Sequence, residues 1–309
     1  MHAWEQIQKT LDYIDENLGE PLGIEQLSEM AALSPFYYQR LFARLVKKPV
    51  MEYVRLRRLA RAAEELSEKG GRILDIALDL GFQSHEHFTR TFKEAFGMTP
   101  EAYRRNPIPL NRMTKPQLLM NYVFLDEGVP LITDGIVLEI NRCTLETPEY
   151  FVGLEKKMPV RFIEGLGVES GVDPLDTLWR TFHDQKNSLD VLAREGDELG
   201  VTHPCAEEGY FTYFAGGKAM DGEGPEGYES WELCPGEYLI CSFEAENFEA
   251  LVMDTLYKVQ QYIFGTWLPR RRLQTEPFCA ERYESHTRDT KKMEIWLKIK
   301  EQQNGKFII

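Results

Sequence analysis

Residues 34–53 read SPFYYQRLFARLVKKPVMEY, and fifty positions later residues 84–103 read SHEHFTRTFKEAFGMTPEAY. At this offset four pairs of residues coincide: Ser34 and Ser84, Arg40 and Arg90, Phe42 and Phe92, Tyr53 and Tyr103. Each stretch begins with serine, a good helix N-cap, and then spaces its apolar residues as a helix does. The sequence therefore predicts one short helix twice, with a shared apolar stripe and a different polar face in each copy.

Helical periodicity extends outward from these stretches through residues 1–105. Further helices are predicted at about 3–18, around 24–31 and from about 49 to 68, where KGG ends the long one. The stretch ILDIALDLGF predicts a short helix before Ser84, and Thr99 with Pro100 begins a last one. The plan is two copies of helix, turn and helix, joined by one long helix.

A helix-turn-helix unit places the start of its second helix against base edges in the major groove of DNA. One stripe of that helix must be apolar and the opposite face must carry donors and acceptors. Both copies meet this requirement. The face left over by the apolar stripe carries Phe36, Tyr37, Gln39, Arg40 and Arg44 in the first copy, and His85, Glu86, Thr89, Arg90 and Lys93 in the second.

The long helix also sets a distance. About 19 residues at ~1.5 Å each span roughly 28 Å, which is comparable to the ~34 Å between successive major-groove faces on one side of a duplex. One chain could therefore read two adjacent major-groove segments of double-stranded DNA without dimerising. The expected target is asymmetric.

The stretch IALDLGFQSHEHFTRTFKEAFGMTPEAYRR, residues 76–105, resembles the signature of AraC/XylS-family transcription regulators. The resemblance implies base contacts from Phe36, Gln39 and Arg40 in the first unit, and from His85, Glu86 and Arg90 in the second. At the position of Glu86 the family more usually has a neutral residue, so the resemblance does not indicate which base the second unit prefers. A metal site at His85, Glu86 and His87 is not expected, because neighbouring positions on a helix point to different sides.

The pattern changes along the rest of the chain. Prolines between 107 and 116 predict a linker, which we place at 108–133, between a DNA-binding domain at 1–107 and a second domain at 134–309. The second domain shows six β-rich runs: GIVLEI, YFVGLE, GYFTYFAG, EYLICSF, FCAERYES and MEIWLKIK. Helices are predicted from Pro174, capped by Asp173, and from Asn247. Interleaved strands and helices indicate an α+β domain.

Several of these segments resemble the GyrI-like effector-binding domain, including LETPEYFVGLE, CPGEYLICSFE, YIFGTWLP and KKMEIWLKIK. The resemblance implies tandem strand-helix-strand repeats around a ligand cavity, with Glu281 as its acidic residue. Alternation places Cys279, Glu281 and Tyr283 on one face of a strand. A carboxylate among aromatic rings suits an organic cation. The wall candidates are Trp179, Phe182, Tyr213, Tyr238, Trp267, Tyr283 and Trp296; alternatively these rings are core and Glu281 pairs with Arg270, Arg271 or Arg272.

Composition narrows the class of protein. Residues 1–112 hold 16 basic and 16 acidic residues, so the net charge of −14 belongs to residues 113–309. The first part is thus not repelled by phosphate. The five cysteines form no C-x-x-C pair, and neither a signal peptide nor a membrane span is evident, so we expect a cytoplasmic protein.

The predicted function is a DNA-binding transcription regulator that senses a small, cationic or amphipathic effector. RNA polymerase is a further candidate partner. No cofactor, metal, membrane or catalytic residue is predicted, because phosphate-binding, nucleophile and zinc motifs are all lacking. Two alternatives remain for the C-terminal domain: a small-molecule hydrolase in which Glu281 directs water, or a module that binds a protein partner.

Overall fold

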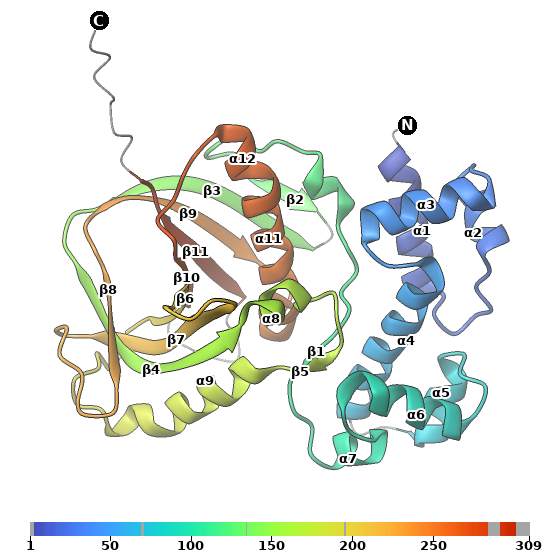
Figure 1. Ribbon diagram of the computed structural model, residues 1–309, viewed down its shortest axis with the longest axis horizontal. Helices are drawn as coiled ribbons and strands as arrows, with labels where there is room; N and C mark the ends of the chain where they lie inside the picture. Colours follow the sequence, from blue (N-terminus) through green and yellow to red (C-terminus); the bar gives the residue numbers. More distant parts are fainter. Residues whose placement is uncertain (1–2, 69–70, 134, 195, 284–290, 301–309) are drawn as a thin grey trace, which may run out of the picture. The chain divides into compact units, whose positions relative to one another are not determined.

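The computed structural model describes residues 3–68, 71–133, 135–194, 196–283 and 291–300. The chain forms two compact units (Figure 1). The helical unit comprises Met1–Val123 and Glu164–Pro174, and the sheet unit comprises Phe124–Ile163 and Leu175–Ile309. Residues 164–174 thus belong to the helical unit, although the chain on both sides of them belongs to the sheet unit. The domain boundaries drawn from the sequence stay a prediction.

The helical unit contains the helices that the periodicity predicts, and each lies within two residues of its expected start. They are α1 (Ala3–Glu16), α2 (Ile24–Met30), α3 (Pro35–Val46), α4 (Val50–Ser67), α5 (Ile73–Asp79), α6 (His85–Phe96) and α7 (Pro100–Arg105). A short two-stranded sheet joins β1 (Leu110–Asn111) to β5 (Gly171–Val172), and one 3₁₀ turn covers Leu118–Asn121. The two helix-turn-helix motifs are α2 with α3, and α5 with α6.

The predicted caps are present. The Ser34 hydroxyl accepts a hydrogen bond from the Tyr37 backbone N–H at 3.4 Å, and Ser84 does the same for His87 at 3.1 Å. Both helices end at a left-handed residue, Lys47 with φ 62° and Gly97 with φ 74°. The repeated stretches therefore begin and end their helices by the same local chemistry.

One continuous apolar core supports both motifs. In the first motif Tyr38 and Phe42 are fully buried, and in the second Phe88 and Phe92 are. The Phe42 and Tyr53 rings meet at 5.6 Å, and the equivalent Phe92 and Tyr103 rings at 5.8 Å. The residues shared by the two stretches thus form the scaffold, as their helical spacing predicts.

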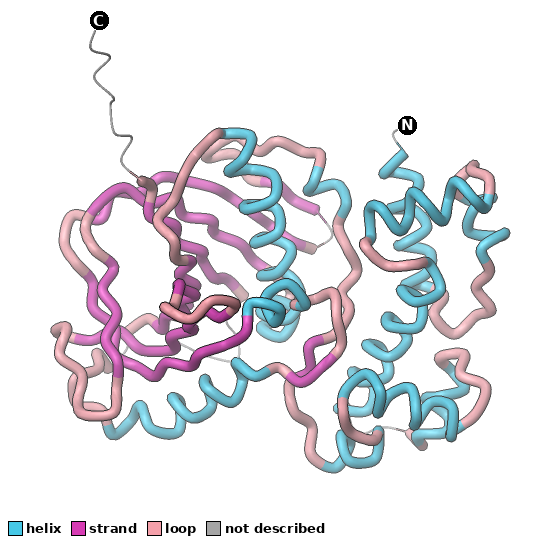
Figure 2. The backbone as a smooth tube through the Cα atoms, viewed as in Figure 1, coloured by secondary structure: helices cyan, strands magenta, loops and turns pink. Residues whose placement is uncertain are grey.

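The sheet unit is built on one antiparallel sheet (Figure 2). Its described strands follow the order β2-β3-β9-β11-β10-β6-β7-β4-β8. They are β2 (Leu131–Thr133), β3 (Ile136–Leu145), β4 (Glu149–Pro159), β6 (Glu198–Pro204), β7 (Tyr210–Ala219), β8 (Glu229–Leu233), β9 (Gly236–Glu244), β10 (Cys279–Tyr283) and β11 (Lys292–Lys298). All six predicted strands are present, whereas β2, β6 and β8 were not predicted.

Helices accompany this sheet. The predicted helix at Pro174 is α9 (Pro174–Gln185), and α8 (Val160–Gly165) precedes it. The helix predicted from Asn247 is α10 (Phe248–Ala250), α11 (Leu256–Tyr262) and α12 (Leu268–Arg271), separated by π-helical turns at Leu251–Thr255 and Ile263–Trp267. No helix among the described residues is both long and apolar enough to cross a bilayer.

Candidate DNA interface and candidate ligand site

The polar face of α3 is open to solvent. Phe36 and Tyr37 are 66% and 64% exposed, which is unusual for large aromatic side chains. The Arg40 guanidinium lies over the Phe36 ring at 5.6 Å, and the Gln39 amide donates to the Pro35 carbonyl at 3.2 Å. Arg44, one turn further along, is also exposed. All five residues predicted for this face are therefore accessible.

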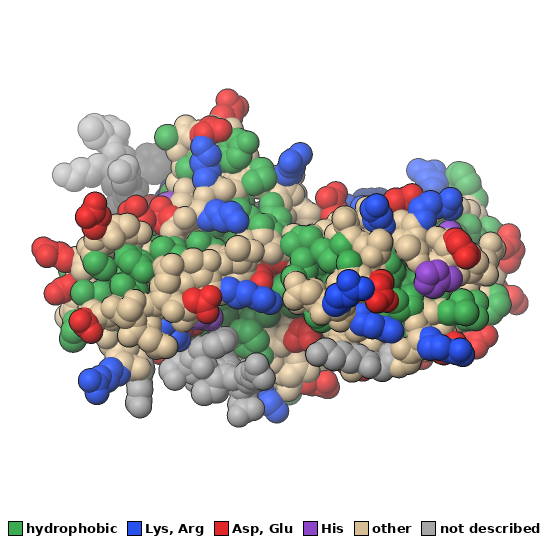
Figure 3. Space-filling view, turned by 90° about the horizontal axis from the view of Figure 1, so that it is seen from below, with side chains coloured by type: hydrophobic (Ala, Val, Ile, Leu, Met, Phe, Trp, Pro, Cys, Tyr) green, Lys and Arg blue, Asp and Glu red, His purple; other side chains and the backbone are tan. Residues whose placement is uncertain are grey.

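The polar face of α6 is open at four of its five predicted residues. His85, Glu86, Arg90 and Lys93 are exposed, while Phe88, Thr91, Phe92 and Phe96 turn inward. Figure 3 shows basic and acidic side chains intermixed on the face of the molecule that it draws.

Two of the residues predicted to contact DNA from α6, Glu86 and Thr89, are not simply free polar side chains on an exposed face. Thr89 is half-buried, and its hydroxyl oxygen is buried without a hydrogen-bond partner among the described residues. A hydrogen bond from its own backbone N–H, and then one from the Ser84 hydroxyl, lower the pKa of Glu86. Glu86 thus also serves the start of α6, where a carboxylate is favourable.

Glu281 lies in the middle of the sheet. On β10 it pairs with Gly200 of β6 and with Ile295 of β11, and its side chain is only 5% exposed. Cys279 and Tyr283 share its face, as alternation predicts. A Cβ at Gly200 would lie 2.2 Å from the Tyr213 hydroxyl oxygen and 3.2 Å from Glu281 Oε2. Glycine at position 200 is therefore what lets these two side chains meet.

The hydrogen bonds shown for the Glu281 carboxylate come from neutral donors. Tyr213 donates to Oε2 at 2.8 Å, Tyr283 donates to the same oxygen at 3.4 Å, and the Gln260 amide of α11 donates to Oε1 at 2.9 Å. Burial, followed by the charge of Glu281, raises the pKa of both tyrosines well above the ordinary value. Both hydroxyls therefore keep the proton that they donate.

Aromatic rings surround this carboxylate on one side of the sheet. Trp179 of α9 donates its ring N–H to the Tyr213 hydroxyl at 3.4 Å and meets the Tyr283 ring edge-on at 5.5 Å. Phe182, on the next turn, lies 6.1 Å from Trp179. Four of the seven predicted wall residues, Trp179, Phe182, Tyr213 and Tyr283, are thus brought together with Glu281.

The other three predicted wall residues lie elsewhere. Trp296 pairs with Ala280, the neighbour of Glu281, and therefore points to the opposite face of the sheet, where it packs on Tyr238 at 5.5 Å. Trp267 donates to the Leu125 carbonyl at 2.8 Å and lies beneath Arg271 at 5.4 Å. Tyr238 and Trp296 thus lie on the face opposite Glu281, which residue type does not reveal. The role of these three residues as walls of a ligand cavity stays a prediction.

Arginines near the end of α12 are the alternative partners that the sequence offers for Glu281. Arg271 forms an ion pair with Asp126 at 2.8 Å and covers the Phe124 ring at 4.6 Å. Arg272 is the left-handed residue that ends α12. The hydrogen bonds that the structure shows for Glu281 come from the two tyrosines and Gln260. Its pairing with Arg270, Arg271 or Arg272 stays a prediction.

A second buried carboxylate lies beside the first and was not predicted. Glu198 of β6 pairs with Tyr283 and accepts hydrogen bonds from His183 at 2.9 Å and Lys186 at 2.7 Å. Burial acts to raise the pKa of Glu198, but the bonds from His183 and Lys186 outweigh it, so the pKa is lowered. The strand that carries Glu198, with the sequence ELGVTHP, was not predicted, because its glycine and proline interrupt the alternation of apolar and polar residues.

Two family models match the chain. A helix-turn-helix domain matches residues 27–106, and a GyrI-like small molecule binding domain matches residues 142–300. The chain is also similar to known regulatory proteins. The uncharacterized HTH-type transcriptional regulator YbfP of Bacillus subtilis is 42% identical over 104 residues, which are 34% of this chain and 35% of YbfP. The chain thus spans about a third of the length of that relative.

Shorter relatives match over most of their length. Regulatory protein SoxS of Salmonella typhimurium is 40% identical over 98 residues, which are 32% of this chain and 92% of SoxS. Among solved structures, a transcriptional regulator with an AraC-type DNA-binding domain from Chromobacterium violaceum is 27% identical, with a TM-score of 0.32. That match covers 34% of this chain and 96% of the other.

Proposed function

Because the chain belongs to the AraC-type helix-turn-helix regulators and carries a GyrI-like small molecule binding domain, we propose that it is a ligand-responsive transcription regulator. This membership confirms the predicted fold class, a helical double helix-turn-helix domain followed by an α+β GyrI-like domain. We propose further that α3 and α6 enter two successive major-groove segments of an asymmetric site. The observation that carries this is the pair of solvent-open polar faces on one shared core.

The spacing supports reading by a single chain. With its 18 residues, α4 is about 27 Å long, close to the ~34 Å of one duplex turn. In this proposal Gln39, Arg40, His85 and Arg90 reach base edges. Phe36 places the Arg40 guanidinium by stacking, which leaves its donors free to pair with guanine or phosphate. Arg44 and Lys93 contact the phosphate backbone.

Selection of bound DNA from a random pool tests this reading. The full-length protein should enrich one asymmetric sequence with two conserved blocks about 10 bp apart, centre to centre. A palindromic consensus would instead indicate a dimer with one motif per half-site. We also propose that the bound regulator contacts RNA polymerase, which a co-precipitation on the selected promoter fragment would test.

For the sheet unit we propose that an organic cation binds at Glu281. A buried carboxylate is costly unless cations or hydrogen-bond donors meet it, and electron-rich ring faces attract cations. Trp179, Tyr213 and Tyr283 supply such rings around Glu281. In this proposal the cation lies against these rings, with the carboxylate held in place by Tyr213 and Gln260.

Calorimetric titration with tetraphenylphosphonium, a bulky organic cation, tests this site. Neutral triphenylphosphine oxide is the control, because it has similar rings without the charge. Stoichiometric binding of the cation alone is expected. Turnover of a bound compound would favour the hydrolase instead, and we propose that the domain has no catalytic role.

The route from ligand to DNA is the last part of the proposal. We propose that it runs through the strap, residues 164–174, which belongs to the helical unit. Asn111 holds the strap with both ends of its amide: it donates to the Gly165 carbonyl at 2.8 Å and accepts from the Gly167 N–H at 2.9 Å. Strand β5 of the strap pairs with β1 and lies next to α6.

The strap continues directly into α9, whose first residue is Pro174. Trp179, five residues further on, is bonded to Tyr213 and so to Glu281. A ligand that displaces Trp179 would therefore shift α9 and, through it, the strap, whose strand β5 lies next to α6. Such a ligand acts only through different affinities for two states of the protein.

A further inference from the structure

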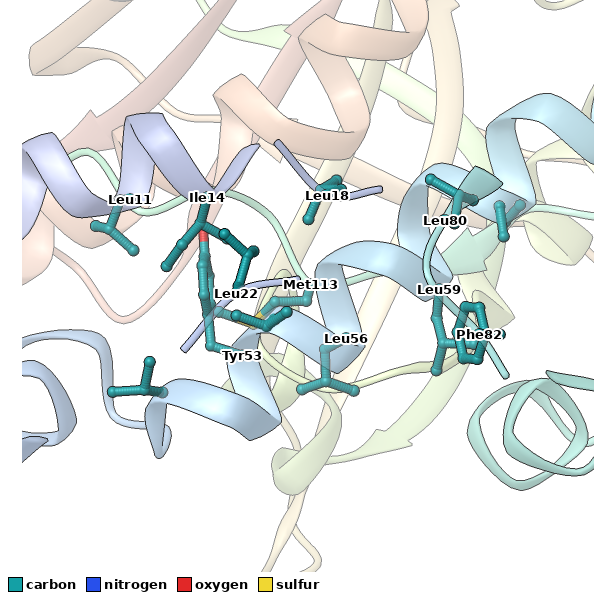
Figure 4. Packing of buried hydrophobic residues seen from close by; sticks show 14 of the residues in the cluster. Leu11, Ile14, Leu18, Leu22, Tyr53, Leu56, Leu59, Leu80, Phe82 and Met113 are labelled. Atoms are coloured by element: carbon teal, nitrogen blue, oxygen red, sulfur yellow. The ribbon is translucent and has the colours of Figure 1, made fainter. Parts of the chain in front are cut away.

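Besides α4, a second contact links the two halves of the helical unit. The loop after α1 reaches the turn between α5 and α6, so that the chain before the first motif touches the second. At Gly19 a Cβ atom would lie 2.3 Å from the Asp79 carbonyl oxygen, so a larger residue fits only if the backbone shifts. Figure 4 shows Leu18 and Leu22 of this loop, Leu80 of the second motif, and Leu56 and Leu59 of α4, all members of one buried cluster.

One side chain of α4 bonds both sides of this contact. The Arg58 guanidinium donates to the Leu18 carbonyl at 2.8 Å, to Glu20 at 2.8 Å and to Gly81 at 3.2 Å. The first two carbonyls belong to the loop after α1, and the third belongs to the turn of the second motif. Because guanidinium donors lie in a rigid planar fork, they fix the direction of their acceptors as well as the distance.

Gly81 completes the arrangement. Its φ of +71° lies in the left-handed region, and a Cβ there would lie 2.9 Å from the Arg58 Cζ atom. The turn therefore needs glycine for two reasons, its backbone conformation and the close approach of the guanidinium. Gly19, Arg58 and Gly81 together form what we call the clamp.

A helix alone fixes how far apart two motifs are, but a second link also resists their rotation about the helix axis. For a protein that binds two DNA segments, the effective concentration of the second motif at its segment depends on that stiffness. We propose that the clamp sets the register between α3 and α6, so that Arg58 selects the spacing of the two half-sites. This inference rests on the proposed two-segment reading.

A spacing series tests the role of Arg58. The selected site is prepared with the spacer between its half-sites as selected, and with one or two base pairs added or removed. Affinity is measured by fluorescence anisotropy with the full-length protein. Wild type should lose about 10-fold or more per misplaced base pair, whereas Arg58→Ala should lose less than about 3-fold. Arg61→Ala is the matched control: it is one turn further along α4, bonded to Glu64 and Glu65, and should keep the wild-type ratio.

Two further variants separate register from stability. Arg58→Lys keeps the charge but loses the planar set of donors, and Gly19→Ala adds a methyl group at the close contact with Asp79. Both variants should therefore lose less affinity than wild type when the spacing is changed. A purely structural role would lower the melting temperature and the affinity for every spacing alike, leaving the ratio unchanged. An unchanged ratio in the three variants overturns the clamp while two-segment reading survives. A wild type that binds all spacings equally overturns both.

Discussion

At the scale of single residues, the Glu281 carboxylate carries the ligand proposal. We expect Glu281→Gln to weaken tetraphenylphosphonium binding by about 2–5 kcal/mol, because removing one partner of a buried charge pair leaves the other uncompensated. DNA affinity should stay within twofold of wild type, because position 281 lies in the sheet unit. Calorimetry and anisotropy on the same preparation measure the two effects. Unchanged cation affinity would remove Glu281 from the site.

Arg40 and Arg90 occupy equivalent places in the two motifs and should contribute to DNA binding in equivalent ways. Replacing either by alanine should cost about 1–3 kcal/mol on the selected site if the contact is to a base. A contact to phosphate would instead weaken all sequences alike and reduce the salt dependence of binding. Arg72→Ala is a suitable control, since Arg72 is also exposed but forms an ion pair with Asp75. Losses under 0.3 kcal/mol from both variants would exclude these arginines from the interface.

Glu198 predicts how stability depends on pH. Its pKa is lowered below the ordinary 4.5 in the folded state, so its contribution is complete above that value and is lost as pH falls through the folded value. Glu198→Gln should therefore lower the free energy of unfolding by about 3 kcal/mol at pH 7, because His183 and Lys186 lose their ion pairs with this carboxylate. The gap between variant and wild type should narrow at about pH 3. Urea titrations at both pH values measure it, and a gap that does not depend on pH contradicts the assignment.

At the scale of elements, the helices were predictable because their signals are local. Ser34 and Ser84 cap helices whose apolar stripes follow a regular spacing, and nothing distant is needed to read them. Strand β6 was missed because Gly200 and Pro204 interrupt its pattern, yet Gly200 is what admits Tyr213 to Glu281. Gln260 was missed because a polar residue on a helix gives no sign of which strand it meets.

The strap gives a prediction at the same scale. Asn111→Ala removes both hydrogen bonds that hold Gly165 and Gly167, while Thr114 still donates to the Gly167 carbonyl at 2.9 Å. We expect tetraphenylphosphonium to shift the DNA affinity of wild type by about 5-fold to 150-fold, and to shift that of the variant much less. Cation affinity of the variant should match wild type. Thr10→Ala is a control, because its buried hydroxyl accepts a hydrogen bond from Tyr38 within the helical unit at 3.1 Å.

The strap account fails if the Asn111 variant responds to the cation as wild type does. It also fails if wild-type DNA affinity does not respond although the cation binds. Hydrogen exchange gives a readout that does not need DNA. The Gly167 and Asp173 amides belong to the strap and donate to Asn111 and to the Pro109 carbonyl in the free protein, so both should exchange faster when the cation is bound.

At the scale of the whole molecule, the sequence indicates two domains but not how the chain is divided between them. Residues 164–174 lie inside the stretch matched by the GyrI-like model and nevertheless pack in the helical unit. Their short strand β5 has two residues, too few for a periodic signal, and its partner β1 lies in the predicted linker. The faces of Tyr238 and Trp296 were likewise unpredictable, since they depend on pairing between distant strands.

The central claim is that α3 and α6 of one chain read adjacent major-groove segments. Methylation interference on the selected site, with wild type, Arg40→Ala and Arg90→Ala, tests it most directly. The account predicts two clusters of interfering guanines about 10 bp apart on one side of the duplex, with each variant losing a different cluster. A single cluster, or two symmetric clusters that both variants weaken equally, would contradict it.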